Sequence, residues 1–268
     1  MAAGTMSADA VNAAAARLFA EHRTARPFDG LPEGLWPADV ANAYAVQDRL
    51  QALYADAGHE IAGWKVALTT PVMQALVGVN HPCEGAIFAD RVRVSPAQVK
   101  AGDYVRIAVE AEIAVRLGRD LGADCAPYDR DGVAAAVEAC MAAIELVDDR
   151  AIDYERLDGP LLIADNAFNF GCVLGPPVSD WRRLDLAGLA GRMRINGEVV
   201  GEGVGGDVMG HPFEALAFLA NSLSHRGKPL RRGQVVMTGS IVATKWPKAG
   251  DEVISEIDGL GEARVGFD

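Results

Sequence analysis

Two glutamate residues separated by one alanine, Glu110 and Glu112, lie within an apolar run from Ile107 to Leu117. The alternation of this run predicts a strand, which would place both carboxylates on one face, about 7 Å apart at their Cα atoms. Carboxylates this close repel each other unless a cation or solvent compensates their charge. The pair therefore indicates either a divalent metal site or a solvated strand face.

A third glutamate, Glu145, favours the metal site, because it lies inside the apolar segment Met141–Val147, where an unpaired charge is costly. Three carboxylates without histidine or cysteine are hard oxygen ligands, which suit Mg²⁺ or Mn²⁺ and leave positions open for water and substrate. We therefore expect Glu110, Glu112 and Glu145 to bind Mg²⁺ or Mn²⁺.

Lys65 lies in a second apolar segment, Ile61–Leu68. A lysine in the middle of an apolar strand needs a carboxylate partner, a ligand or a lowered pKa. It is either part of a structural ion pair or, if burial and a nearby metal ion lower its pKa toward neutrality, a general acid–base group.

Several other kinds of site are excluded by their missing context. The GxGxxG match at Gly201–Gly206 follows an expected hairpin and no N-terminal βαβ unit accompanies it, so we expect a glycine-rich loop near the active site and no dinucleotide. The five histidines form no HxxxH pair, and no GxSxG motif is present, so a serine hydrolase is not expected. The four cysteines form no CxxC pair, which indicates unpaired thiols in a reducing compartment.

The bulk composition limits the partners of the chain. Its 268 residues are 50% hydrophobic and 23% charged, as in globular proteins. The net charge of −12 disfavours nucleic acid and anionic membranes, which need a basic surface. Because no run of 18 apolar residues and no secretory leader is apparent, we expect a cytoplasmic protein that acts on a small molecule.

These side chains must be positioned by an α+β fold in which a helical N-terminal region, residues 1–60, precedes a β-rich catalytic domain, residues 61–268. Helical spacing predicts helices over Ala8–Arg23, Pro37–Gly58, Gly132–Ala142 and Pro212–Arg226. Strands are expected at 61–68, 104–117, 144–147, 234–238 and 252–267, with a hairpin over Arg192–Gly201 that turns on Asn196-Gly197. Because helices and strands do not alternate regularly, a doubly wound parallel sheet is not expected.

Six segments occur in a familiar order over nearly the whole chain: Gly63–Thr69, Val109–Ala114, Ile144–Arg150, Ala164–Ala167, Gly210–Pro212 and Thr238–Ser240. Together they resemble the 2-keto-4-pentenoate hydratase and 4-oxalocrotonate decarboxylase family, within the fumarylacetoacetate hydrolase superfamily. The resemblance implies a β-rich fold of the fumarylacetoacetase C-terminal type, assembled as a homo-oligomer, with Mg²⁺ or Mn²⁺ at the three glutamates. It also implies that Lys65 transfers protons, that Thr69 and Thr70 lie near the substrate carboxylate, and that Asp165 and Ser240 line the substrate pocket.

Two positions depart from the family pattern. Ala67 stands where the family usually has glycine, which is a mild change. Pro82-Cys83-Glu84-Gly85 stands where relatives commonly have Pro-Asp-aromatic-Gly. If that aspartate assists proton transfer in relatives, its role here is absent, taken over by Glu84, or not needed.

The expected activity is that of a hydro-lyase, which adds water to a 2-hydroxy-2,4-dienoate to give a 4-hydroxy-2-oxo acid, as in meta-cleavage catabolism of aromatic compounds. The alternatives are a 2-oxo-3-enedioate decarboxylase, an acylpyruvate hydrolase that cleaves a C–C bond, and a silent partner subunit. The hydrolase would need a base such as a His–Glu pair, and the silent subunit would not need three glutamates. A decarboxylase needs a second cation for its second carboxylate. Lys245 is either that cation or an exposed loop lysine, and we expect the latter.

Overall fold

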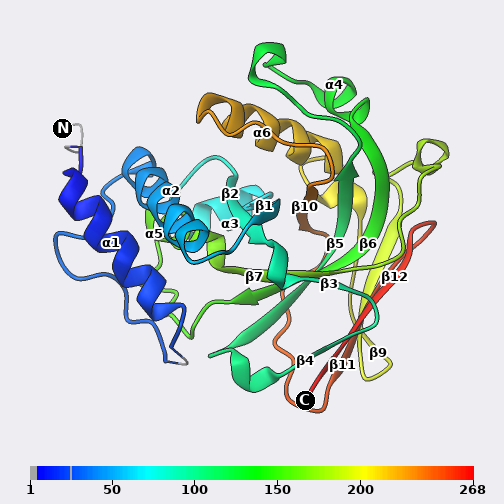
Figure 1. The fold of residues 1–268 in the computed structure, drawn as a ribbon. Helices are drawn as coiled ribbons and strands as arrows, with labels where there is room; N and C mark the ends of the chain where they lie inside the picture. Colours follow the sequence, from blue (N-terminus) through cyan, green and yellow to red (C-terminus); the bar gives the residue numbers. More distant parts are fainter. Residues whose placement is uncertain (1–4, 25) are drawn as a thin grey trace.

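The computed structural model describes residues 5–24 and 26–268, so residues 1–4 and Ala25 of the expected helical region lie outside the described residues. The strands of the described residues all belong to two sheets that pack around a common apolar core. Figure 1 shows the N-terminal helices at one end of the molecule and the C-terminal strands at the other, with the long strands β5 and β6 curving between them. This is the expected α+β arrangement.

The larger sheet contains the three glutamates and Lys65. Its seven strands are ordered β2-β1-β10-β5-β6-β7-β3, and it is mixed, because the β1–β10 and β3–β7 pairs are parallel while the others are antiparallel. The strands are β1 (Ile61–Ala67), β2 (Cys83–Phe88), β3 (Val92–Val94), β5 (Ile107–Leu117), β6 (Val137–Asp148), β7 (Asn169–Leu174) and β10 (Val235–Ser240).

The smaller sheet has the order β4-β12-β11-β8-β9. Its strands are β4 (Ala97–Val99), β8 (Ala190–Ile195), β9 (Glu198–Val204), β11 (Glu252–Ile257) and β12 (Gly261–Phe267). The hairpin expected at Asn196-Gly197 is confirmed, since these two residues join β8 to β9 with φ values of 52° and 86°. Asparagine and glycine tolerate this left-handed conformation better than other residues.

Six α-helices accompany the sheets in the part of the chain that the structure describes. They are α1 (Ala8–Glu21), α2 (Val40–Asp56), α3 (Pro71–Leu76), α4 (Arg130–Ala134), α5 (Gly159–Ala164) and α6 (Pro212–His225). Helix α1 packs on α2, and α2 packs on α5. The second helix begins three residues later than expected, because the Asp39 carboxylate accepts a hydrogen bond from the Asn42 amide and caps the helix there. No helix among the described residues is long and apolar enough to cross a membrane.

The helix expected over Gly132–Ala142 is wrong. Only Arg130–Ala134 is helical, and strand β6 begins at Val137. The alanines of this segment favour a helix locally, but the chain here pairs along its length with β5 on one side and, from Ala143, with β7 on the other. Sheet pairing and burial override the local preference.

Candidate active site

The three glutamates lie together because β5 and β6 are neighbouring antiparallel strands. Glu110 is directly opposite Glu145 in the register, and Glu112 lies two residues further along β5 on the same face. One carboxylate oxygen from each residue lies within 4.8 Å of the others. Like charges directly opposite each other would destabilise a bare strand pair, so this arrangement needs a compensating charge.

The surroundings of this cluster fit a divalent cation. Glu112 and Glu145 are fully buried, and Oε1 of Glu112 and Oε2 of Glu145 have no hydrogen-bond partner. Burial raises the pKa of Glu112 well above its usual value, and the negative charges of Glu145 and Glu110 raise it further. Burial and the charge of Glu110 also raise the pKa of Glu145, although Lys65 opposes them. Unpartnered carboxylate oxygens of this kind are the ligands that Mg²⁺ and Mn²⁺ prefer.

Three further residues fix the orientation of the glutamates. The Thr244 hydroxyl donates to Oε1 of Glu110 at 2.5 Å, the Gly239 amide to Oε2 of Glu112 at 2.8 Å, and the Asn169 side chain to Oε1 of Glu145 at 2.9 Å. Such partners orient metal ligands and tune their affinity. None of the three was predicted to contact a glutamate, because each lies far from its partner along the chain.

Lys65 lies against the same cluster, so the expected carboxylate partner is present. Its side chain is 5% exposed, and Nζ lies 3.2 Å from Oε1 of Glu145. Burial lowers the pKa of Lys65, but the combined attraction of Glu145, Glu110 and Glu112 outweighs it, so that the pKa is raised above its ordinary value. Lys65 is therefore charged while the carboxylate charges remain uncompensated.

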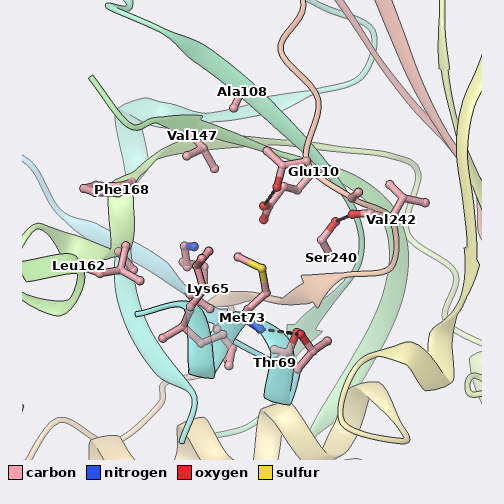
Figure 2. A pocket seen from close by; sticks show the side chains of 18 of the residues that line it. Lys65, Thr69, Met73, Ala108, Glu110, Val147, Leu162, Phe168, Ser240 and Val242 are labelled. Carbon is pink, nitrogen blue, oxygen red and sulfur yellow. Dashed lines mark hydrogen bonds between the residues drawn. The ribbon is translucent and has the colours of Figure 1, made fainter. Parts of the chain in front are cut away.

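A cavity of about 620 Å³ opens onto Lys65 and Glu110. Figure 2 shows the Glu110 carboxylate and the Lys65 ammonium both pointing into it, with the Met73 side chain beside them in this view. In this view Leu162 and Phe168 lie on one side of the cavity, and Ser240 and Val242 lie on the other. The cavity walls are largely apolar, with Leu68, Met73, Leu76, Val77, Ala108, Val147, Leu157, Leu162, Ala167, Phe168, Ile241, Val242, Ala243 and Trp246 among the lining residues.

Three of the expected substrate-binding residues line this cavity: Thr69, Thr70 and Ser240. The Thr70 hydroxyl also caps helix α3 by accepting from the Met73 amide at 3.4 Å. Gly239 has φ of +119°, and a Cβ at this position would lie 2.5 Å from Thr69 Cγ2. Only glycine therefore allows β10 to approach Thr69 this closely.

Asp165 does not line the cavity. It is fully buried behind it, where its carboxylate accepts from Arg150 and lies 2.5 Å from Nε2 of His22. The backbone then turns through Asn166, Ala167 and Phe168, all with positive φ. Ala167 and Phe168 do line the cavity, so Asp165 is connected to the site through this turn.

The position of Glu84 answers the question raised by the Pro82–Gly85 segment. Its carboxylate accepts hydrogen bonds from Tyr44, Ser222 and Arg226, which come from α2, α6 and the end of α6. Glu84 therefore has no free oxygen for proton transfer and is not among the cavity residues. Cys83, its neighbour, is buried, and this burial raises the pKa of its thiol to about 12.

Two other expectations concern Lys245 and the glycine-rich segment Gly201–Gly206. Thr244 and Trp246 line the cavity and Lys245 between them does not; Cε of Lys245 lies 3.8 Å from the place that a Cβ on Gly201 would take. The glycine-rich segment Gly201–Gly206 lies beside the cavity, as expected, but it is not a loop, because Gly201–Val204 pair with β8 as part of strand β9. A Cβ on Gly203 would lie 1.9 Å from the carbonyl oxygen of Ile241, a cavity residue, so glycine is required for β9 to pack there.

Comparisons with known proteins give matches over most of the chain. Residues 79–267 match the model of the fumarylacetoacetate (FAA) hydrolase C-terminal family. The chain is 35% identical over 253 residues to a 2-keto-4-pentenoate hydratase of Burkholderia vietnamiensis, covering 94% of this chain and 95% of that protein. It is 32% identical over 256 residues to a 2-hydroxyhexa-2,4-dienoate hydratase of Comamonas testosteroni, covering 94% and 95%. A solved structure of 4-oxalocrotonate decarboxylase from Pseudomonas putida G7, complexed with magnesium and adipate, superposes with a TM-score of 0.91 at 28% identity, covering 99% of this chain and 100% of that one.

Proposed function

The chain belongs to the fumarylacetoacetate hydrolase family, and from this premise we propose that it is a hydro-lyase that adds water to a 2-hydroxy-2,4-dienoate. The product is a 4-hydroxy-2-oxo acid of the kind formed in meta-cleavage catabolism of aromatic compounds. The observation that supports the proposal most is the cluster of half-buried Glu110 with buried Glu112 and Glu145 next to Lys65, at a cavity that Glu110 and Lys65 line. Relatives that match over nearly the full length are named as hydratases of this substrate class.

Each part of the cavity has a role in this reaction. A divalent cation, Mg²⁺ or Mn²⁺, bound by the three glutamates would supply positive charge beside the 2-oxygen of the substrate, where negative charge develops during enolisation. Lys65 moves a proton to or from a substrate carbon. The hydroxyl groups of Thr69 and Thr70 donate to the substrate carboxylate, and Ser240, whose hydroxyl donates to the Val242 carbonyl oxygen at 2.7 Å, lines the pocket beside them. Asp165, which we expected to touch the substrate, instead positions the Ala167–Phe168 wall.

The decarboxylase alternative is less well supported by the charges around the cavity. A dioate carries a second carboxylate, which needs a cationic partner at the far end of the site. Among the described residues that line the cavity, Lys65 is the only cation, whereas Glu202 and Asp207 are both acidic. Lys245, the cation considered for that role, does not line the cavity. These charges favour a monocarboxylic substrate.

The test is a product assay with two substrates. Enzyme loaded with Mg²⁺ is given 2-hydroxypenta-2,4-dienoate and, separately, 2-oxohex-3-enedioate. We expect 4-hydroxy-2-oxopentanoate from the first and little CO₂ from the second. Release of CO₂ from the dioate without hydration of the dienoate would show that the chain is a decarboxylase, and C–C cleavage of an acylpyruvate would show that it is a hydrolase.

We propose that the enzyme acts in the cytoplasm as a homo-oligomer. The exposed apolar side chains of Val72 and Leu76 on α3, which are 78% and 56% accessible, are consistent with a surface that another subunit covers. Light scattering on the purified protein measures the oligomeric state directly.

A further inference from the structure

The cavity is much larger than the substrate considered so far. A 2-hydroxypentadienoate has eight non-hydrogen atoms. If each atom occupies no more volume than a water molecule does in the liquid, which is ~30 Å³, the substrate fills at most about 240 Å³. The cavity measures about 620 Å³. A cation and its ordered waters account for only a small part of the difference, so more than half of the cavity would have no substrate atoms in it.

Much of the lining beyond the acid-binding groups is apolar. In Figure 2, Glu110, Thr69 and Ser240 lie around the centre and one side of the cavity, and Lys65 lies between Met73 and the other side. The other side, which we call the apolar end, consists of Val147, Leu162 and Phe168 (Figure 2). Val147 is 9%, Leu162 7% and Phe168 6% exposed, so these side chains are held in the wall.

We propose that the enzyme acts on 2-hydroxypenta-2,4-dienoates that carry a bulky apolar substituent on C5, such as a phenyl ring, and that the apolar end binds this substituent. The inference rests on the proposed hydratase function and names its substrate class. When the acid end lies at Glu110 and Ser240, a rigid planar diene extends away from these groups, and its C5 atom points toward the opposite wall. Water and polar substituents gain nothing against Val147, Leu162 and Phe168, whereas a ring of carbon atoms buries its surface there.

Binding can be tested separately from the reaction. 2-Oxo-5-phenylpentanoate and 2-oxopentanoate share the acid end and the 2-oxo group, but neither has a double bond to hydrate. Calorimetry with the Mg²⁺-loaded enzyme should give a dissociation constant at least about tenfold lower for the phenyl compound, because burial of a phenyl ring is worth at least this factor. Equal affinities, or weaker binding of the phenyl compound, would overturn the proposal.

Turnover is then measured with 2-hydroxypenta-2,4-dienoate and its 5-phenyl derivative. We expect kcat/KM for the phenyl substrate to exceed that for the unsubstituted one by about tenfold or more. If α3 closes over the site and reduces the cavity to the size of the small substrate, only the unsubstituted dienoate will react, and the proposal is wrong. If neither dienoate reacts although the phenyl acid still binds more tightly, the proposed hydratase function is wrong, whereas the apolar end is still a binding site for the phenyl ring.

Variants of Leu162 locate the substituent. Leu162→Phe adds bulk inside the apolar end and should lower the ratio of kcat/KM between the phenyl and unsubstituted substrates about tenfold, whereas Leu162→Met keeps the volume and should restore most of the ratio. Val94→Phe is the matched control, because Val94 is 76% exposed on β3 and does not line the cavity. If Leu162→Phe does not fold, the two ligand comparisons with the unchanged enzyme still decide the question. A ratio unaffected in a folded Leu162→Phe variant would place the substituent elsewhere and overturn the assignment.

Discussion

At the scale of single residues, the site depends on carboxylate oxygens that have no partner within the protein. Oε1 of Glu112 and Oε2 of Glu145 are buried without a hydrogen bond, while their other oxygens accept from Gly239 and Asn169. A buried charge without a partner is costly, so the folded chain has a standing need for a cation at this point. Removing one carboxylate charge should be visible first in metal affinity.

The first prediction is that Glu112→Gln weakens Mg²⁺ or Mn²⁺ binding at least tenfold, about 1.4 kcal/mol, because it keeps the size of the side chain and removes a ligand charge. Titration calorimetry measures the affinity. In the unchanged enzyme, EDTA should abolish turnover and added Mg²⁺ or Mn²⁺ should restore it. Full activity after removal of the metal would contradict the assignment.

Lys65 provides the second prediction. Lys65→Met should lower kcat roughly 100-fold or more, the usual scale for loss of an acid–base group, with metal affinity changed much less. Lys245→Ala is a matched control, because this lysine lies beside the cavity wall without lining it, and its activity should stay near that of the unchanged enzyme. Normal turnover by Lys65→Met would leave Lys65 with only its ion pair to Glu145.

The third prediction concerns the four thiols. Cys125 is exposed, whereas Cys83, Cys140 and Cys172 are buried. Burial raises the pKa of Cys83 and Cys140 to about 12, so neither forms a reactive thiolate near neutral pH. A thiol reagent at pH 8 should therefore modify one cysteine rapidly in the native protein, and Cys125→Ser should abolish this reaction. Rapid labelling of a second thiol would contradict the structure.

At this scale the sequence was most informative about the charged residues. An E-x-E pair on an expected strand and a glutamate within an apolar run were enough to indicate the three carboxylates that the fold brings together, and Lys65 stood out for the same reason. Thr244 and Asn169 could not be identified in this way. Polar residues are common in loops, and only the tertiary arrangement brings Thr244 to Glu110 and Asn169 to Glu145.

At the scale of elements, strand pairing and helix capping decided where the sequence-based expectations held. The hairpin at Asn196-Gly197 and helix α6 carry strong local signals and were predicted correctly. The alanine-rich segment before Glu145 was predicted as a helix, because its preference for β6 comes from pairing with β5 and β7, which are distant in sequence. For the same reason, the sequence did not predict the contact between His22, which directly follows α1, and Asp165, because the two residues are distant in sequence.

The contact between His22 and the buried carboxylate of Asp165 leads to the fourth prediction. Burial lowers the pKa of His22 below 6.5; Asp165 opposes this shift, but Arg150 and Arg91 add to it, and Tyr54 occupies the other ring nitrogen. Because the Arg150 guanidinium already neutralises the Asp165 carboxylate, the contact of His22 with this carboxylate does not reverse the lowering of the His22 pKa. As the pH falls through 6.5, the unfolded chain binds a proton that the folded chain does not, so the free energy of unfolding decreases.

Denaturant unfolding at pH 7, 6 and 5 measures this effect. His22→Gln should make the free energy of unfolding fall less steeply over this range than in the unchanged protein. His225→Gln replaces an exposed histidine at the end of α6 and should leave the slope as it was. An unchanged slope in His22→Gln would show that His22 does not titrate differently in the folded state.

At the scale of the whole molecule, the N-terminal helices are joined to the rest of the protein by polar contacts as well as by a common apolar core. The Gln47 side chain in α2 donates to the backbone oxygens of Glu84 and Ile163, in β2 and α5. Tyr44 and His22 bind the buried carboxylates of Glu84 and Asp165. Removal of the helices would leave these groups buried without partners or exposed to water.

The fifth prediction follows from these contacts. A chain of residues 61–268 alone should not fold cooperatively, although these residues were expected to form the catalytic domain. Circular dichroism during thermal unfolding and light scattering measure cooperativity and aggregation. A monodisperse fragment with a sharp transition and metal-dependent turnover would instead show that residues 1–60 form a dispensable region.

The direct pairing of Glu110 with Glu145 also makes the proposed metal site dependent on the correct register of β5 and β6. If β5 slipped by one residue against β6, Glu110 and Glu112 would turn to the opposite face of the sheet and the three carboxylates would no longer meet. A cation that needs all three binds only molecules that have paired correctly, and by mass action it draws the population toward them. Molecules with a misaligned sheet would therefore be those that fail to retain the ion, and the cell's supply of the metal would influence how much correctly folded enzyme accumulates.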